Sequence, residues 1–310
     1  MMQESLAEEA AEKVAAALRK TADENEHVKD VLKAFGGILI EQARWAASLE
    51  LPDGGEAAVD AAGFEKGIPA SSREELIRLG GLWKEAARRL IPALEAGFPE
   101  VREKFRRIAE VLEGGSLDPD LFFGAAFGGR DGDARAMAER VGVEAELLGF
   151  VLTQLAKPVA EKRAAKISLA AAGLSWDRGY CPVCGSLPDL SLLREKEGRR
   201  WLRCSFCAAL WRFQRLQCPF CGSVEAGDAE LFYVEGRETE RVEACRGCGR
   251  YITEWDVRGM AGEAVLEVAP FRLLHLDVMA RKKGFQSAIA GNWAGLSGGD
   301  PPAGIVNRPV

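Results

Sequence analysis

The chain has 310 residues, of which 47% are hydrophobic and 28% are charged, and its formal net charge is -6. A chain of this length exceeds the size at which one hydrophobic core is usual, so two domains are expected. The negative charge disfavours a nucleic-acid partner, which usually requires a basic face, and no uncharged apolar run approaches the roughly 18 residues of a transmembrane helix.

The amino-terminal segment predicts neither export nor membrane insertion. It begins acidic and alternates charged residues with alanine, so it lacks the basic start and the apolar stretch of a secretory signal. We therefore expect a cytoplasmic protein. In that reducing compartment thiols bind metal ions more often than they form disulfides.

Residues 1–175 contain no cysteine and predict a series of helices. Ser5 with Glu8, and Ser72 with Glu75, have the spacing of capping boxes at helix starts. Apolar residues at helical spacing predict helices over these ranges: 5–19, 27–49, 73–94, 99–112, 119–127, 133–140 and 144–155. Pro158 is expected to start a further helix that ends near residue 172. The prediction for this part is an irregular α-helical domain over residues 1–175.

The composition changes at residue 176 to cysteine, arginine, glycine and short β-prone runs. One hairpin is predicted from strands 190–193 and 200–203, and a second from strands 231–234 and 240–242. A helix is predicted over 271–282. The glycine- and proline-rich residues 293–310 are expected to form a mobile tail.

Eight cysteines form four C-x-x-C pairs, and each predicted hairpin lies between two of these pairs. Two thiolates from one tight turn can bind one metal ion, so four pairs predict two tetrahedral four-sulfur sites. Sequential pairing requires no chain crossing, whereas cross-bracing of alternate pairs is the less favoured arrangement. The predicted ligands of the first ion are Cys181, Cys184, Cys204 and Cys207, and those of the second ion are Cys218, Cys221, Cys245 and Cys248.

The spacing leaves the metal and its role open. Zinc suits a closed structural site, and iron fits the same four sulfurs in a rubredoxin-like centre. Gly185, Gly222 and Gly249 each follow the second cysteine of a pair, where a metal knuckle needs a positive φ. Catalytic dithiols and merely buried cysteines are the weaker interpretations, while purely structural zinc staples are a serious one.

The residues around the cysteines resemble those of the formate dehydrogenase accessory proteins of the FdhE type. The resemblance is carried by the run from Tyr180 to Pro188, by Leu202 to Cys207 with Trp211, by Cys218 to Gly222, and by Cys245 to Tyr251. It implies an α+β fold: a helical domain over 1–175, a first metal ribbon over 176–217, and a second ribbon with a terminal helix over 218–292. Both ribbons would be rubredoxin-like or zinc-ribbon hairpin modules that hold iron or zinc.

The resemblance also implies a function. Proteins of this family are cytoplasmic maturation factors that bind the catalytic subunit of respiratory, molybdenum-dependent formate dehydrogenases before its export through the twin-arginine route. They are not enzymes themselves. The expected partner is therefore a formate dehydrogenase catalytic subunit, with neither nucleic acid nor membrane insertion involved.

The remaining sequence carries no signature of catalysis. His27 and His275 lie in predicted helices far from the cysteines, and no nucleophile elbow, phosphate loop or dinucleotide fingerprint is present. We therefore expect a non-enzymatic protein. Two alternatives stay open at this point: a nucleic-acid-associated zinc-ribbon protein, and a rubredoxin-like electron-transfer protein.

Arginines cluster around the ribbons, which by itself favours the nucleic-acid alternative. The cluster comprises Arg194, Arg199, Arg200, Arg203, Arg212 and Arg215. Basic and acidic residues are, however, equal in number over 176–260, so a solvated charged face is the simpler interpretation. Arginine beside Trp201, Trp211 and Phe213 is also typical of protein interfaces, which favours recognition of an acidic partner segment.

Overall fold

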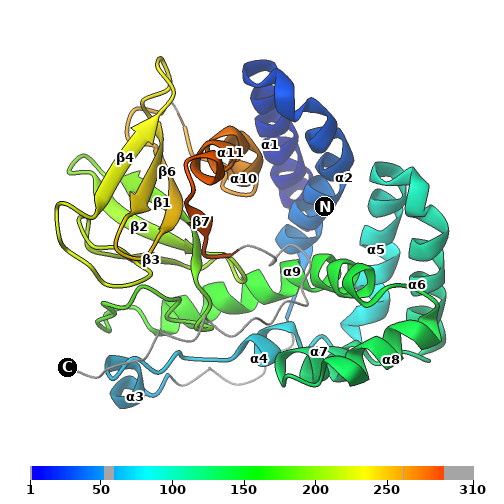
Figure 1. Ribbon diagram of the computed structural model, residues 1–310. Coiled ribbons are helices and arrows are strands. Elements are labelled where there is room, and N and C mark those ends of the chain that lie inside the picture. The colour runs from blue at the N-terminus through cyan, green and yellow to red at the C-terminus, as the bar shows by residue number, and fades with distance from the viewer. Residues whose placement is uncertain (1, 52–58, 261, 290–310) are drawn as a thin grey trace.

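The computed structural model describes residues 2–51, 59–260 and 262–289, so the tail expected over 293–310 lies outside the described residues. Helices form one side of the molecule and a twisted sheet forms the other, and α9 extends from the helices to below the sheet (Figure 1). The helices of the amino-terminal part are α1 (Met2–Glu24), α2 (Lys29–Ser48), α3 (Ala61–Glu65), α4 (Arg73–Ile77), α5 (Leu82–Gly97), α6 (Arg102–Gly114), α7 (Pro119–Phe127), α8 (Asp131–Val141) and α9 (Ala145–Ala170). Two 3-10 turns, Glu26–Val28 and Pro99–Val101, precede α2 and α6.

Two helix predictions near prolines and glycines are wrong. The helix expected over 73–94 is two helices, because the chain breaks between α4 and α5, where Gly80 has a φ of 53°. The break expected at Pro158 is absent, and α9 continues through it. Pro158 has no N–H for the carbonyl of Gln154, but the Gln42 side chain donates to that carbonyl at 2.9 Å and replaces the missing bond.

The connection between α4 and α5 is fixed by polar side chains from two distant helices. The Asp120 carboxylate in α7 accepts hydrogen bonds from the Leu79 and Gly80 amides at 3.3 and 3.2 Å and from the Trp83 indole at 2.9 Å. Arg163 in α9 donates to the Leu76 and Arg78 carbonyls at 2.9 and 2.8 Å. These bonds satisfy the carbonyls at the end of α4 and the amides at its junction with α5.

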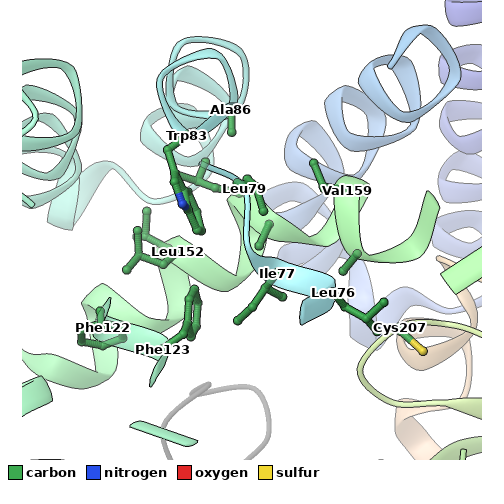
Figure 2. Close-up of a cluster of buried hydrophobic side chains, with 14 of the residues drawn as sticks. Leu76, Ile77, Leu79, Trp83, Ala86, Phe122, Phe123, Leu152, Val159 and Cys207 are labelled. Atoms are coloured by element: carbon green, nitrogen blue, oxygen red, sulfur yellow. The ribbon is translucent and has the colours of Figure 1, made fainter. Parts of the chain in front are cut away.

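The largest hydrophobic cluster joins the helices to the first cysteine group. Buried side chains of α5, α7 and α9 pack together with Leu76 and Ile77 of α4, and Cys207 belongs to the same cluster. Figure 2 shows Trp83, Phe123 and Leu152 converging on this centre, with Cys207 at its edge. The helical region and the first ribbon therefore share one core.

The two ribbons form a single seven-stranded sheet. Its strands are β1 (Pro188–Arg194), β2 (Arg199–Cys204), β3 (Leu210–Arg212), β4 (Ala229–Tyr233), β5 (Glu240–Cys245), β6 (Arg250–Asp256) and β7 (Gln286–Ser287). The order is β3-β2-β1-β6-β5-β4, with β7 also paired to β6. The hairpins predicted from the sequence are β1–β2 and β4–β5, and the parallel pairing of β1 with β6, from Leu190 opposite Thr253 to Leu193 opposite Asp256, joins them.

The carboxy-terminal helix prediction corresponds to two helices, α10 (Ala269–Arg272) and α11 (Leu274–Lys282). Leu276 and Ala280 of α11 pack on one face of the sheet, while Phe271 of α10 packs against α1 and α2. Figure 1 shows α10 and α11 between the sheet and the α1–α2 pair. Within the described ranges, none of the helices is both long enough and apolar enough to cross a membrane.

Candidate metal centres

The first cysteine group lies at the junction of the helices and the sheet. The Cys181 and Cys207 sulfurs are 3.7 Å apart, and the Cys184 sulfur lies 3.5 Å from that of Cys204 and 3.6 Å from that of Cys207. All four side chains are buried. These are the four cysteines that sequential pairing of the C-x-x-C motifs predicts.

The second group lies at the end of the β4–β5 hairpin that is opposite the hairpin turn, and it is more open to solvent than the first group. The Cys218 and Cys248 sulfurs are 3.8 Å apart, and those of Cys221 and Cys245 are 3.7 Å apart. Cys245 is buried, Cys218 and Cys248 are half-buried, and Cys221 is exposed. The two groups therefore have similar geometry but different access to solvent.

All four C-x-x-C turns have the same backbone conformation. In each turn the amide four residues after the first cysteine donates to that cysteine's carbonyl, at distances of 2.8–3.2 Å. The donors are Gly185, Ala208, Gly222 and Gly249, and all four have a positive φ. Three of these positions are the glycines expected from the sequence. Ala208 is the exception, because a methyl group occupies a conformation that favours glycine.

Backbone amides of the turns point toward sulfur. In the first group, the Val183 amide donates to the Cys181 sulfur at 3.3 Å, and the Phe206 and Cys207 amides donate to the Cys204 sulfur at 3.4 Å. Such amides stabilise thiolates, which are the metal-binding form of cysteine.

The electrostatics of the first group call for a cation. Hydrogen bonding from Cys181 and the other cysteines lowers the pKa of the Cys184 thiol, whereas burial raises the pKa of Cys204 well above its usual value. When no cation balances the charge, Cys184 therefore favours the thiolate and Cys204 the thiol. A divalent cation at the centre would compensate the other thiolates.

The sulfur spacing fits a tetrahedral metal ion. Metal–sulfur bonds of about 2.3 Å in a tetrahedron place the sulfurs about 3.8 Å apart, close to the separations of 3.5–3.8 Å observed in the two groups. The donor set is all sulfur, which selects zinc or iron over the hard cations that prefer oxygen. Both groups therefore fit a four-thiolate metal ion.

The first turn is bonded directly to the helical part of the chain. The Ala70 and Ser71 amides donate to the Pro182 and Val183 carbonyls at 2.9 and 2.8 Å, so the segment before α4 runs alongside this turn. The Tyr180 hydroxyl donates to the Gly67 carbonyl at 2.8 Å. The position of the first centre is consequently fixed by segments more than a hundred residues apart in sequence.

A close backbone contact at Gly179 joins the two centres. A Cβ atom on Gly179, just ahead of Cys181, would lie 1.9 Å from the Pro219 carbonyl oxygen in the turn of the second group. Only glycine allows this approach. The turn of the second centre therefore packs directly against the segment that leads into the first.

Two of the clustered arginines are buried, so the expectation of a solvated charged face is wrong for them. Arg200 donates to the Ser191 hydroxyl at 3.0 Å and pairs with Glu243 between the hairpins. Arg203 pairs with Asp189 at 3.3 Å, and burial raises the pKa of that carboxyl. These arginines hold the sheet together and are not available to a partner. The acidic residues opposite them had no sequence signal, because they lie on other strands.

The two histidines are distant from both cysteine groups. His27 is exposed in the 3-10 turn before α2. His275 is half-buried in α11, where its Nδ1 lies 3.2 Å from the Arg272 carbonyl oxygen, and burial lowers its pKa. Neither contacts a thiol.

Comparisons with known proteins agree with this architecture. The family model for the central domain of FdhE matches residues 180–215, which span the first cysteine group and β1 to β3. The FdhE homolog of Aquifex aeolicus is 32% identical over 147 residues, which are 46% of this chain and 51% of the relative. Protein FdhE of Escherichia coli is 33% identical over 78 residues, 24% of this chain and 25% of the relative. The aligned part thus spans about half the length of these curated relatives or less.

The fold likeness extends over most of the chain. The crystal structure of the FdhE protein from Pseudomonas aeruginosa superimposes with a TM-score of 0.64 at 20% sequence identity, and the match covers 90% of this chain and 93% of that one. At this identity the match concerns the fold. The family model and the curated relatives thus show that part of the chain is similar to FdhE proteins, and the superposition shows that the fold is shared over most of the chain.

Proposed function

We propose that the protein is a formate dehydrogenase accessory protein, which works in the cytoplasm, binds the catalytic subunit of a respiratory formate dehydrogenase and assists its assembly before export. The observation that carries the proposal is the match of residues 180–215 to the central domain of FdhE, at the position where the first cysteine group forms. The protein has no catalytic role of its own in this proposal. It acts by binding.

The proposal includes two metal ions, each iron or zinc. Their ligands are Cys181, Cys184, Cys204 and Cys207 for the first and Cys218, Cys221, Cys245 and Cys248 for the second. Bound ions would supply the positive charge that four clustered thiolates require. Anaerobic purification with elemental analysis should give two metal ions per chain, and a visible thiolate-to-iron absorption separates iron from colourless zinc.

Direct binding to the catalytic subunit tests the function. The full chain should retain a purified formate dehydrogenase catalytic subunit and should not retain an unrelated molybdenum enzyme of similar size. The nucleic-acid alternative is checked in the same experiment with heparin at physiological salt. Retention on heparin together with tight RNA or DNA binding, and no retention of the subunit, would overturn the proposal.

A second candidate function is electron transfer, which the exposed Cys221 sulfur favours, because an iron centre there would lie at the surface. An iron-loaded chain with a reversible couple at physiological potentials would support it. Zinc in both centres would exclude it.

A further inference from the structure

The edge of the sheet at β3 has main-chain groups that pair with no other strand. The Cys204 amide donates to the Ala209 carbonyl and the Phe213 amide donates to the Arg200 carbonyl, so the hydrogen-bonded positions of β3 are odd-numbered. By the alternation of an antiparallel pair, Leu210 and Arg212 point their N–H and C=O groups away from β2. Within the described part of the chain, no backbone hydrogen bond reaches these four groups.

A half-open groove lies beside this free edge. Its volume is about 630 Å³, and its opposite wall is the end of α9 with the segment up to Asp177. The apolar side chains that line it include Phe64, Trp176, Leu210, Trp201, Trp211 and Phe213. Exposed sheet edges are normally short, charged or covered. Strand β3 is itself short and carries the exposed Arg212, but its unpaired main-chain groups beside three tryptophans have the features of a site that receives an added strand.

The charge of the groove favours an acidic occupant. Asp177 on the groove wall is paired with Arg178 at 3.3 Å, whereas Arg212, on the edge strand itself, is exposed and makes no ion pair or hydrogen bond with any described residue. An acidic side chain of an added strand would meet this guanidinium. A basic side chain would meet an uncompensated positive charge.

We propose that the groove binds an extended segment of the partner protein, with apolar residues alternating with acidic ones, which adds to the sheet as a strand beside β3. Alternation places the apolar side chains on the face of the sheet that carries Trp211 and Phe213, and the acidic side chains on the opposite face, where Arg212 lies opposite Trp201. The inference rests on the proposed function in that the segment belongs to the catalytic subunit. The site itself is defined by the groove and can be tested without that subunit.

The first test uses a synthetic peptide of alternating isoleucine or phenylalanine and glutamate, with a counterpart in which lysine replaces each glutamate. The acidic peptide should bind at least ~10-fold more tightly, since its charges complement Arg212, and should slow hydrogen exchange at the Leu210 and Arg212 amides. Arg212→Glu should reverse the preference between the peptides. Unchanged exchange at both amides in the presence of saturating acidic peptide would overturn the proposal.

The second test uses the catalytic subunit and one proline at each edge of the sheet. Leu210→Pro removes an outward N–H without removing a hydrogen bond of the sheet, so an edge strand tolerates it. Leu231→Pro is the matched control on the opposite edge strand, β4, where Leu231 also points its N–H outward. Leu210→Pro should weaken binding of the subunit at least ~10-fold, whereas Leu231→Pro should bind the subunit as tightly as the wild-type chain. Both variants should keep the metal content of the wild-type chain.

The outcomes separate the two proposals. Equal binding of the subunit to both proline variants would remove the groove from the contact and leave the proposed function standing. The wild-type chain could instead fail to bind the subunit while the acidic peptide still protects the Leu210 and Arg212 amides. That result would refute the catalytic subunit as the partner and would leave the groove standing as a site that binds an extended segment.

Discussion

Ala208 has a φ of 55° at a position where the other three C-x-x-C turns have glycine. An L-residue in this region costs about 1–2 kcal/mol, and the greater freedom of glycine in the unfolded chain offsets about 0.4–1 kcal/mol of that cost. We therefore expect Ala208→Gly to raise the free energy of unfolding by about 0.5–1 kcal/mol. Denaturant unfolding of the metal-loaded protein measures it.

Gly249→Ala is the matched control for this prediction. A Cβ at Gly249 meets no atom within 4 Å, so only the backbone conformation, with a φ of 71°, opposes the substitution. It should destabilise the protein by a similar amount. If both variants unfold at the wild-type denaturant concentration, positive φ is not what constrains these turns.

Gln42 makes a continuous α9 possible despite Pro158. Its Nε2 donates to the Gln154 carbonyl, which the proline leaves without a helical partner, at a buried position. Gln42→Leu leaves this carbonyl unsatisfied and should lower the free energy of unfolding by about 1–3 kcal/mol.

The control for Gln42→Leu is the same substitution in a Pro158→Ala background. Alanine restores the N–H that bonds the Gln154 carbonyl, so the cost should fall by more than ~0.5 kcal/mol in the double-mutant cycle. An equal cost in both backgrounds would show that Gln42 stabilises the protein by packing alone.

At the scale of elements, the sequence predicts the helices and hairpins that form between residues close together in the chain. The hairpins β1–β2 and β4–β5 follow from short β-prone runs with turn residues between them, and α1, α2 and α6 follow from apolar spacing, whereas α3 and the break between α4 and α5 are not predicted. The cysteine grouping is predictable because each hairpin brings two C-x-x-C turns together. The path of α9 through Pro158 is not, because its missing hydrogen bond is replaced by a side chain 112 residues away.

The joining of the two hairpins into a single sheet also cannot be predicted from local sequence patterns. The parallel pairing of β6 with β1 connects residues about sixty positions apart, and no local sequence pattern in either strand predicts the other as its partner. The buried pair Arg200–Glu243 depends on the same long-range pairing, whereas Arg203–Asp189 lies within the β1–β2 hairpin. This is why arginines that look like a surface patch in the sequence are in part structural.

The different burial of the two centres predicts their order of metal loss. Cys221 is exposed, whereas all four sulfurs of the first centre are buried in the main core. A chelator can reach the first centre only when that core opens, and this opening costs more free energy than the local motion that exposes the second centre. Under a strong chelator with iodoacetamide, the second group should be alkylated at least ~10-fold faster, as measured by peptide mass spectrometry. Simultaneous modification of all eight cysteines would contradict this order.

At the scale of the whole molecule, the first cysteine group belongs to the core of the helical part. Cys207 packs in one cluster with residues of α4, α5, α7 and α9 (Figure 2), and the Ala70 and Ser71 amides bond to its neighbouring turn. Loss of this centre should therefore destabilise helices that are far from it in sequence. Cys221 lies outside that cluster, at the solvent-exposed end of the sheet.

Cys207→Ser and Cys221→Ser test this coupling as a pair, since each removes one sulfur from a four-sulfur centre. Cys207→Ser should lower the free energy of unfolding by ~3 kcal/mol or more, a fraction of the ~10–16 kcal/mol with which four thiolates bind a structural zinc ion. Its helical circular dichroism and tryptophan fluorescence should be lost in one transition at a lower temperature. Cys221→Ser should leave the helical transition within a few degrees of wild type, because Cys221 lies outside the main cluster and only the half-buried Cys218 and Cys248 of its group pack against it. Helices that melt at the wild-type temperature in Cys207→Ser would mean that the helical part is stable without the first centre.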